Sequence, residues 1–359
     1  MIEPGSVPGS ATCPKHMTFG PCGGVRNDGS CEVDVRPCPF ISVRPLEATA
    51  TLALRKGALT AAPDLDLDLG AVPIIVDVRY PRQLNAPAGD VREWWAAAGQ
   101  VLRGKWALLG EHVDGAVGHE DAGTLDPADA IDLLASAGIR TIATVTGRDR
   151  DLVEADATMR RYAAAGASAI HCVTGDHPAV LGLSRSAIFG AESMTILDTA
   201  HRLGFAATVA ESPLALGDRV ARLLMKQHGG ASMVLLNHGG DASTMIDFAN
   251  RCRSAGVRLP LVAPVAMVAD LDTGRALAAF PGLQLPPGLL LAINSAEDPR
   301  ALGLAQAREH TSVLAASGLF AGVNVSGGTV SPDPGLRLDL MSEFAEAVAG
   351  AWSSNAVTA

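Results

Sequence analysis

The sequence predicts a (β/α)8 barrel, a TIM-barrel type of α/β fold, preceded by a small cysteine-rich module. Eight short apolar segments alternate with helix-like segments over roughly 280 residues, which matches the strand number and length of such a barrel. Hydrophobic residues make up 48% of the 359 residues and charged residues 18%, so a large core is available. Four of the six cysteines fall among glycines and prolines near the N-terminus, in a segment with little core of its own.

These observations divide the chain into three parts. Residues 1–45 form the cysteine-rich module, residues 46–70 a linker or added edge strand, and residues 71–352 the barrel. The linker contains an acidic alternation from Asp64 to Leu69 that fits neither neighbour. A doubly wound sheet is the alternative to the barrel, but no G-x-G-x-x-G follows any expected strand.

The expected strands are short, apolar and partly β-branched, as is typical of strands buried on both faces. We expect them at 72–78, 106–110, 140–145, 169–173, 206–209, 233–236, 259–262 and 322–325. Helical patterns lie between them at 90–101, 127–137, 151–165, 193–202, 216–227, 243–255, 273–280, 300–317 and 338–352. Several of these patterns end within a residue or two of a glycine, which is a common C-terminal stop.

The cysteine-rich module has the donors for a metal ion. Cys13, Cys22, Cys31 and Cys38 are separated by eight, eight and six residues. Four thiolates in so short a segment suit tetrahedral zinc, which would also supply folding energy. An iron–sulfur cluster, His16 in place of one cysteine, and a set of unligated thiols remain alternatives.

Polar side chains follow several expected strands, where the functional groups of a barrel are found. Asp77, Asp176 and Asn237 stand at three strand ends, with hydroxyls at Thr144, Thr146 and Thr174. Two carboxylates, an amide and hydroxyls at one mouth favour proton transfer to a polar heterocycle over hydrolysis, since no nucleophile–His–Asp arrangement accompanies them. Arg148 and Asp149 are expected to shape their loop first, with cofactor contact as the second interpretation.

Charge and hydropathy exclude several classes of partner. A formal net charge of −10 gives no footprint for nucleic acid or anionic lipid. No uninterrupted apolar run reaches the roughly 18 residues of a membrane span. The first ten residues lack the basic and apolar regions of a secretion signal. We therefore expect a cytoplasmic protein with reduced cysteines.

Motifs in both parts resemble one family. The module's run CPK…GPCGG…GSCEV is similar to the cysteine-rich domain associated with methylenetetrahydrofolate reductases. In the barrel, TVTGRDRD, IHCVTGDHP and MKQHGGASMVLLNHGGD resemble the reductase motifs of the third, fourth and sixth strands, in the same order.

The resemblance implies an oxidoreductase that reduces 5,10-methylenetetrahydrofolate to 5-methyltetrahydrofolate with hydride from NAD(P)H, usually by way of FAD. It implies that Asp77 donates a proton to the folate, that Asn237 holds the pterin and that Asp176 lies near both flavin and folate. Lys226 matches a lysine near the cofactor's phosphates. The remaining residues assigned to the cofactor are Thr144, Thr146, Arg148, Thr174 and Gly175.

Four positions depart from the family pattern. Asp77 and Asn237 are each one methylene shorter than the family's Glu and Gln, Thr144 replaces His, and Gly147 replaces Cys. Alternatives therefore stay open: Glu111 or Glu211 as the acid, and direct hydride transfer without flavin. The chain is also compatible with a folate-binding subunit of a methyl-transfer or O-demethylation complex. The module is a candidate surface for a partner protein or for a homo-oligomer of this chain.

Overall fold

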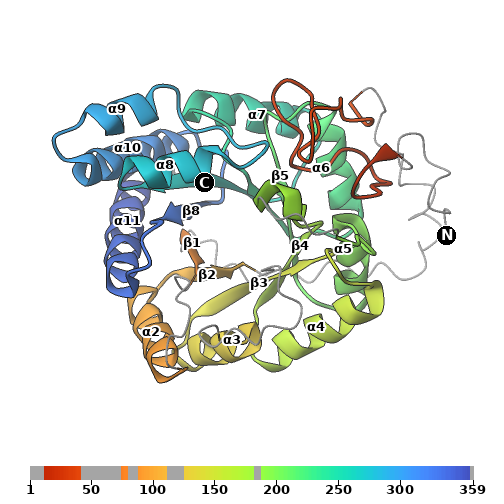
Figure 1. The fold of residues 1–359 in the computed structure, drawn as a ribbon, viewed down its shortest axis with the longest axis horizontal. Helices are drawn as coiled ribbons and strands as arrows, with labels where there is room; N and C mark the ends of the chain where they lie inside the picture. Colours follow the sequence, from red (N-terminus) through yellow and green to blue (C-terminus); the bar gives the residue numbers. More distant parts are fainter. Residues whose placement is uncertain (1–11, 42–73, 80–87, 111–124, 182–186, 356–359) are drawn as a thin grey trace.

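The computed structural model describes residues 12–41, 74–79, 88–110, 125–181 and 187–355. Eight parallel strands close into a barrel in chain order, from β1 to β8, with helices on the outside (Figure 1). The predicted fold class is confirmed. The predicted linker, residues 46–70, lies outside the described residues.

The strands follow the predicted segments closely. They are β1 (Ile74–Val78), β2 (Trp106–Leu109), β3 (Arg140–Thr146), β4 (Ala169–Val173), β5 (Ala207–Glu211), β6 (Met233–Leu236), β7 (Leu261–Val268) and β8 (Gly322–Gly328). The main difference is β7, which continues through Pro264. The pairing of β6 with β7 ends at Leu235↔Val262, whereas the pairing of β7 with β8 runs on to Val268↔Gly328. Beyond Val262 the strand is paired on one side only, where proline is tolerated.

The helices alternate with the strands. They are α2 (Ala88–Val101), α3 (Pro127–Ser136), α4 (Leu152–Ala164), α5 (Ser193–Arg202), α6 (Arg219–His228), α7 (Ala242–Ser254), α8 (Leu271–Ala278), α9 (Leu289–Ser295), α10 (Pro299–Ala316) and α11 (Pro334–Asn355), with a short 3-10 helix, η2 (Pro178–Leu181). The sequence did not predict α9, because seven residues are too few to display a helical period. Among the described helices, none is long and apolar enough to cross a membrane.

Aspartates begin many of these helices. The side chains of six aspartates accept a hydrogen bond from a backbone N–H of the first turn: Asp126, Asp151, Asp218, Asp241, Asp270 and Asp298. Such caps satisfy N–H groups that have no partner within the helix. These carboxylates therefore stabilise the fold, and Asp241, which follows β6 closely, is one of them.

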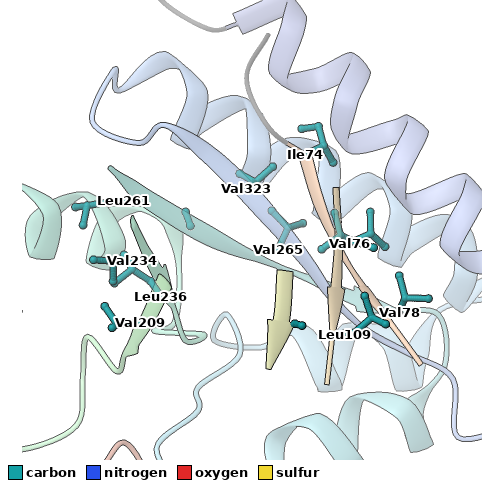
Figure 2. Close-up of a cluster of buried hydrophobic side chains, with 14 of the residues drawn as sticks. Ile74, Val76, Val78, Leu109, Val209, Val234, Leu236, Leu261, Val265 and Val323 are labelled. Atoms are coloured by element: carbon teal, nitrogen blue, oxygen red, sulfur yellow. The ribbon is translucent and has the colours of Figure 1, made fainter. Parts of the chain in front are cut away.

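The core has two layers that follow the alternation of side chains along each strand. The outer layer packs strand residues against the helices, and Figure 2 shows part of it, including Val76, Leu109 and Val323. The inner layer fills the barrel with strand residues: Ile75, Trp106, Leu108, Ile142, Ala169, Met233, Leu235 and Val262. The polar residues at the strand ends lie beyond this inner layer, so they line the open mouth of the barrel.

Gly147, the residue that replaces a family cysteine, is required by packing. A Cβ at this position would lie 1.9 Å from the carbonyl oxygen of Ala191. We expect Gly147→Ala to destabilise the protein by about 1–3 kcal/mol, as overpacking usually does. Urea unfolding measures this, with Gly350→Ala as the control, because a Cβ at Gly350 in α11 meets nothing within 4 Å. An equal stability of the two variants would contradict the prediction.

Candidate functional site

Two adjoining cavities of about 420 and 340 Å3 lie at the mouth of the barrel. Both are lined by Arg79, Gly110, Thr144, His171, Asn237, Phe280 and Leu283, so they form one cleft. The nine barrel residues that the sequence assigns to the site all line it: Asp77, Thr144, Thr146, Arg148, Thr174, Gly175, Asp176, Lys226 and Asn237. The structure thus brings the predicted residues together, and their roles stay predictions.

Asp77 lies on β1 at one end of the cleft. Its Oδ1 atom is buried and has no hydrogen-bond partner among the described residues. Burial raises the pKa of Asp77 to about 6, although a hydrogen bond with Asn324 and the charge of Arg79 act in the opposite direction. A carboxyl group with this pKa is half protonated near pH 6 and keeps a protonated fraction at neutral pH, which suits general acid catalysis.

Asp176 follows β4 at the other end of the cleft. Its side chain is accessible through the cavity, yet it lies deep enough for burial to raise the pKa of its carboxyl, while Lys15 lowers it. The backbone around it is fixed by Arg148, whose Nη1 donates to the Asp176 carbonyl oxygen at 2.9 Å. The neighbouring Asp149 shapes its own loop, because its N–H donates to Ile188 O and its Oδ1 accepts from Ile188 N.

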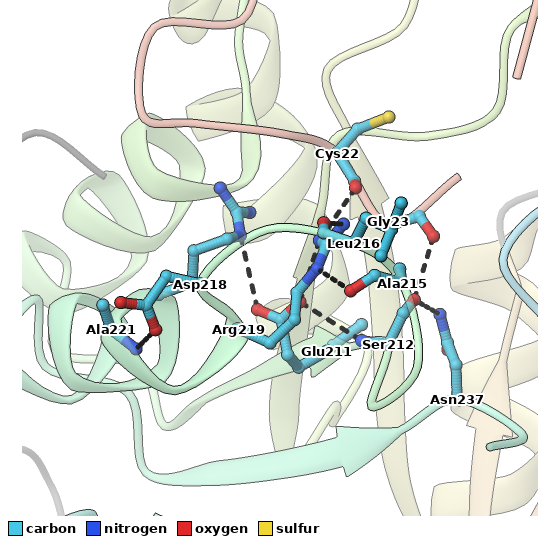
Figure 3. A network of polar contacts seen from close by, with 12 residues as sticks. Cys22, Gly23, Glu211, Ser212, Ala215, Leu216, Asp218, Arg219, Ala221 and Asn237 are labelled. Carbon is cyan, nitrogen blue, oxygen red and sulfur yellow. Dashed lines mark hydrogen bonds and ion pairs between the residues drawn. The ribbon is translucent and has the colours of Figure 1, made fainter. Parts of the chain in front are cut away.

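Asn237 is held from the side of the cysteine-rich module. Its Nδ2 donates to Ser212 Oγ at 2.8 Å, and Ser212 Oγ donates to the Gly23 carbonyl oxygen at 2.9 Å (Figure 3). The amide is therefore oriented by a chain of bonds that ends in the module. Although Asn237 is shorter than the family's Gln, hydrogen bonds fix the position of its amide.

A buried cluster of charges forms part of the wall of the larger cavity, which Glu211, Arg222 and Lys226 help to line. Glu211, at the end of β5, is 2.7 Å from Lys226 Nζ, 3.3 Å from Arg219 Nη1 and 3.4 Å from Arg222 Nε. Despite burial, these three cations lower the pKa of Glu211 to about 2. Glu211 is therefore ionised at neutral pH and does not suit the alternative role of proton donor. Glu111, the other alternative acid, lies outside the described residues.

Two buried histidines also line the cleft, and both are neutral. His171 Nδ1 lies 2.8 Å from Thr208 Oγ1, and burial lowers its pKa to about 4. His238 Nε2 lies 2.6 Å from Ser326 Oγ, and burial lowers its pKa to about 3. Neutral imidazoles beside hydroxyl groups can hydrogen-bond a polar heterocycle without bringing a charge into the cleft.

The cysteine-rich module packs against the barrel mouth beside α6, as the red segment of Figure 1 shows. Arg219 Nη1 donates to Cys22 O at 3.0 Å, and Arg222 Nη1 donates to Phe19 O at 2.8 Å. The module also lines the larger cavity with Lys15, Cys22, Gly23, Gly24 and Glu32. Sequence reasoning missed this contribution, since no local pattern relates Lys15 or Glu32 to strands more than 100 residues away.

The four-cysteine metal site stays a prediction. In the part of the chain that the structure describes, no group of three or more His, Cys, Asp or Glu side chains is placed to hold a metal ion. Cys22 Sγ points to Glu32 Oε2 at 3.6 Å, and Cys13 packs with Met17 and Phe40 in a small apolar cluster. All four cysteines nevertheless line one small cavity of about 10 Å3.

The cleft fits a flavin dinucleotide poorly. Lys226, which the resemblance assigns to the cofactor's phosphates, is 2% exposed, and its ammonium donates to Glu211 Oε2 and Ala210 O. Side chains of the module occupy one wall of the larger cavity. Phe280 is the only phenyl or indole ring among the described residues that line that cavity. The lysine charge expected near a flavin's phosphates is thus paired with Glu211, and the cavity offers little aromatic surface.

Comparisons with known proteins agree with the resemblance of the module and with the fold. Residues 2–57, which contain all four of these cysteines, match the family model described as methylene-tetrahydrofolate reductase C terminal. No curated protein matches the chain. A solved structure from Clostridium thermocellum is similar with a TM-score of 0.57 and 12% identity, over 77% of this chain and 95% of that one. It is described as an uncharacterized protein that binds two copies of 5-methyl-5,6,7,8-tetrahydrofolic acid. At this identity the similarity shows a shared fold.

Proposed function

We propose that the cleft binds a reduced folate and that the protein reduces 5,10-methylenetetrahydrofolate to 5-methyltetrahydrofolate with NAD(P)H. The family match of residues 2–57 and the ligand of the similar solved structure support the class of substrate. The observation that carries the reaction type is the buried Oδ1 atom of Asp77, which has no hydrogen-bond partner among the described residues and lies in a cleft of suitable size. A pKa of about 6 lets this group deliver a proton near neutral pH.

The chemistry assigns one proton and one hydride. Asp77 donates its proton to N10 of the folate, the bond between N10 and the bridging methylene breaks, and an iminium forms at N5. Hydride from NAD(P)H then adds to the methylene carbon, which gives the 5-methyl product and NAD(P)+. Asp77 recovers its proton from solvent. Asn237, fixed by Ser212, hydrogen-bonds the pterin ring during these steps.

Hydride passes directly from the nicotinamide to the folate, because the residues of the cleft fit a flavin poorly. The protein is therefore expected to be colourless when pure. A bound chromophore absorbing near 450 nm, about where flavins absorb, would contradict direct transfer.

The test of the proposed function is turnover by the wild-type protein. Purified protein is mixed with methylenetetrahydrofolate and either NADH or NADPH, and loss of the reduced nicotinamide is followed together with formation of 5-methyltetrahydrofolate. Equal amounts of NAD(P)+ and methyl product are expected. Oxidation of the nicotinamide without methyl product would contradict the assignment of the substrate.

A folate-binding subunit of a methyl-transfer complex is the second candidate. Two observations favour it. The side chains of Asp77 and Asn237 are shorter than those that the family has there, and the sequence resemblance associates a module of this type with a partner subunit. Two results would favour this function over the reductase. Calorimetry would detect binding of 5-methyltetrahydrofolate by a protein that shows no turnover, and a partner would co-purify with it.

We also propose that the cysteine-rich module binds zinc. The donor set supports it, since all four cysteines are among the residues that line one small cavity and thiolates are preferred ligands of zinc. Metal analysis is expected to find about one zinc per chain, lost in Cys38→Ser, because a structural site needs four ligands. Protein free of metal would contradict the proposal, and iron with visible absorbance would indicate a cluster instead.

A further inference from the structure

The loop that carries Asp176, residues 174–177, is held by two side chains of the cysteine-rich module. Lys15 Nζ donates to the carbonyl oxygen of Gly175 at 2.6 Å. The backbone N–H of His177 donates to Glu32 Oε1 at 3.1 Å. These two peptide groups lie immediately before and immediately after Asp176. The module therefore holds the backbone by hydrogen bonds on both sides of this residue, and we call this pair of contacts the grip.

Lys15 and Glu32 form a buried ion pair that makes the grip rigid. Their side chains are 5% and 3% exposed, and Lys15 Nζ lies 2.5 Å from Glu32 Oε1. The ammonium also lies 5.4 Å from the centre of the Phe189 ring. A buried charge that lost its partner would be costly, so the two side chains stay together and keep their distance to the loop.

The loop needs external support because of its backbone. Gly175 has a φ of +89°, in the left-handed region, and a Cβ there would lie 3.0 Å from Thr146 Cβ. Glycine gives this turn its shape but loses more conformational entropy on ordering than other residues do. The contacts from Lys15, Arg148 and Glu32 together fix one backbone group in each of three consecutive residues: Gly175 O, Asp176 O and His177 N.

We propose that Lys15 and Glu32 are positioning residues for Asp176, and that the module thereby forms a permanent wall of the ligand site. The pair acts on ligand binding through the orientation of the Asp176 carboxylate. The contact between Asp176 and the folate rests on the proposed function, whereas the grip on the loop is independent of it.

The first experiment measures the grip without ligand, by amide hydrogen exchange of the full-length protein. Lys15→Met is expected to raise exchange in peptides covering residues 174–177 by about ten-fold or more, since local opening becomes easier. Glu32→Gln keeps an acceptor oxygen for His177 N and is expected to show a smaller rise. Arg36→Gln, which removes an exposed cation from the same module, is the control and should leave this loop unchanged. Unchanged exchange in Lys15→Met would overturn the proposal.

The second experiment measures the affinity for 5-methyltetrahydrofolate in a double-mutant cycle. Lys15→Met is expected to weaken binding about ten-fold in the wild-type background, a coupling of ordinary size for residues in one network. In the Asp176→Ala background the same change should have almost no further effect. Equal losses in both backgrounds would indicate a general structural role and overturn the positioning role. If the wild-type protein binds no folate, the proposed function fails, and hydrogen exchange still decides whether the module grips the loop.

Discussion

Asp77→Asn is expected to lower the turnover number for methylenetetrahydrofolate reduction by about 10²–10⁴-fold, the usual contribution of a general acid. The amide has the shape of the carboxyl group but carries no transferable proton. The affinity for the folate should change little, because Asn still offers a polar group to the ligand. Steady-state oxidation of NAD(P)H measures the turnover number and the KM separately.

The stability of this variant separates chemistry from folding. The pKa of Asp77 in the folded protein is about 6, above its ordinary value of 3.8. The folded protein therefore binds this proton more tightly than the unfolded chain does. At neutral pH, burial of the ionised carboxylate lowers the free energy of unfolding. Since Asn removes that cost, Asp77→Asn should unfold at the same temperature as wild type or higher. A loss of activity that accompanied a lower melting temperature would not support the role of Asp77 in proton transfer.

The pH dependence follows from the same group. Only the protonated form of Asp77 donates, so the rate should fall as the pH rises above about 6. Asp77→Glu, which introduces the family's residue, should retain turnover. Asp132→Asn removes an exposed carboxylate on α3 and serves as the control. A rate that stayed constant from pH 5 to 8 in the wild type would point to another proton donor.

The sequence was informative wherever the determining interactions are local. Apolar strands and the glycines that end helices are features of short segments, so the barrel could be predicted from them. Parallel strands place their C-terminal residues, such as Asp77 and Asn237, at one mouth. The extension of β7 through Pro264 was missed because the number of paired neighbours of a strand is a property of the closed barrel. Lys15 was missed for a related reason: it contacts Gly175 across 160 positions of sequence, and only the folded chain brings them together.

Glu211 has the largest expected effect on stability. Glu211→Gln leaves Arg219, Arg222 and Lys226 buried without their shared counter-charge, and all three side chains are 3% exposed. Removal of one partner from a buried ion pair usually destabilises a protein by about 3–5 kcal/mol. We expect a loss of this size in urea unfolding at pH 7. Asp156→Asn, which breaks an exposed pair with Arg160 on α4, should cost at most about 1 kcal/mol.

The pH dependence of stability identifies the carboxylate as the source of this effect. The pKa of Glu211 in the folded protein is about 2, below its ordinary value of 4.5. Its contribution is therefore fully present above about pH 4.5 and is lost as the pH falls toward 2. Glu211→Gln should remove this part of the acid denaturation, so its stability should vary less than that of the wild type across that window.

Because Arg219 and Arg222 also donate hydrogen bonds to Cys22 O and Phe19 O, the variant should loosen the module as well. Faster hydrogen exchange in residues 18–23 would show this. A variant that lost stability without loosening these residues would show that the charge cluster stabilises the barrel alone.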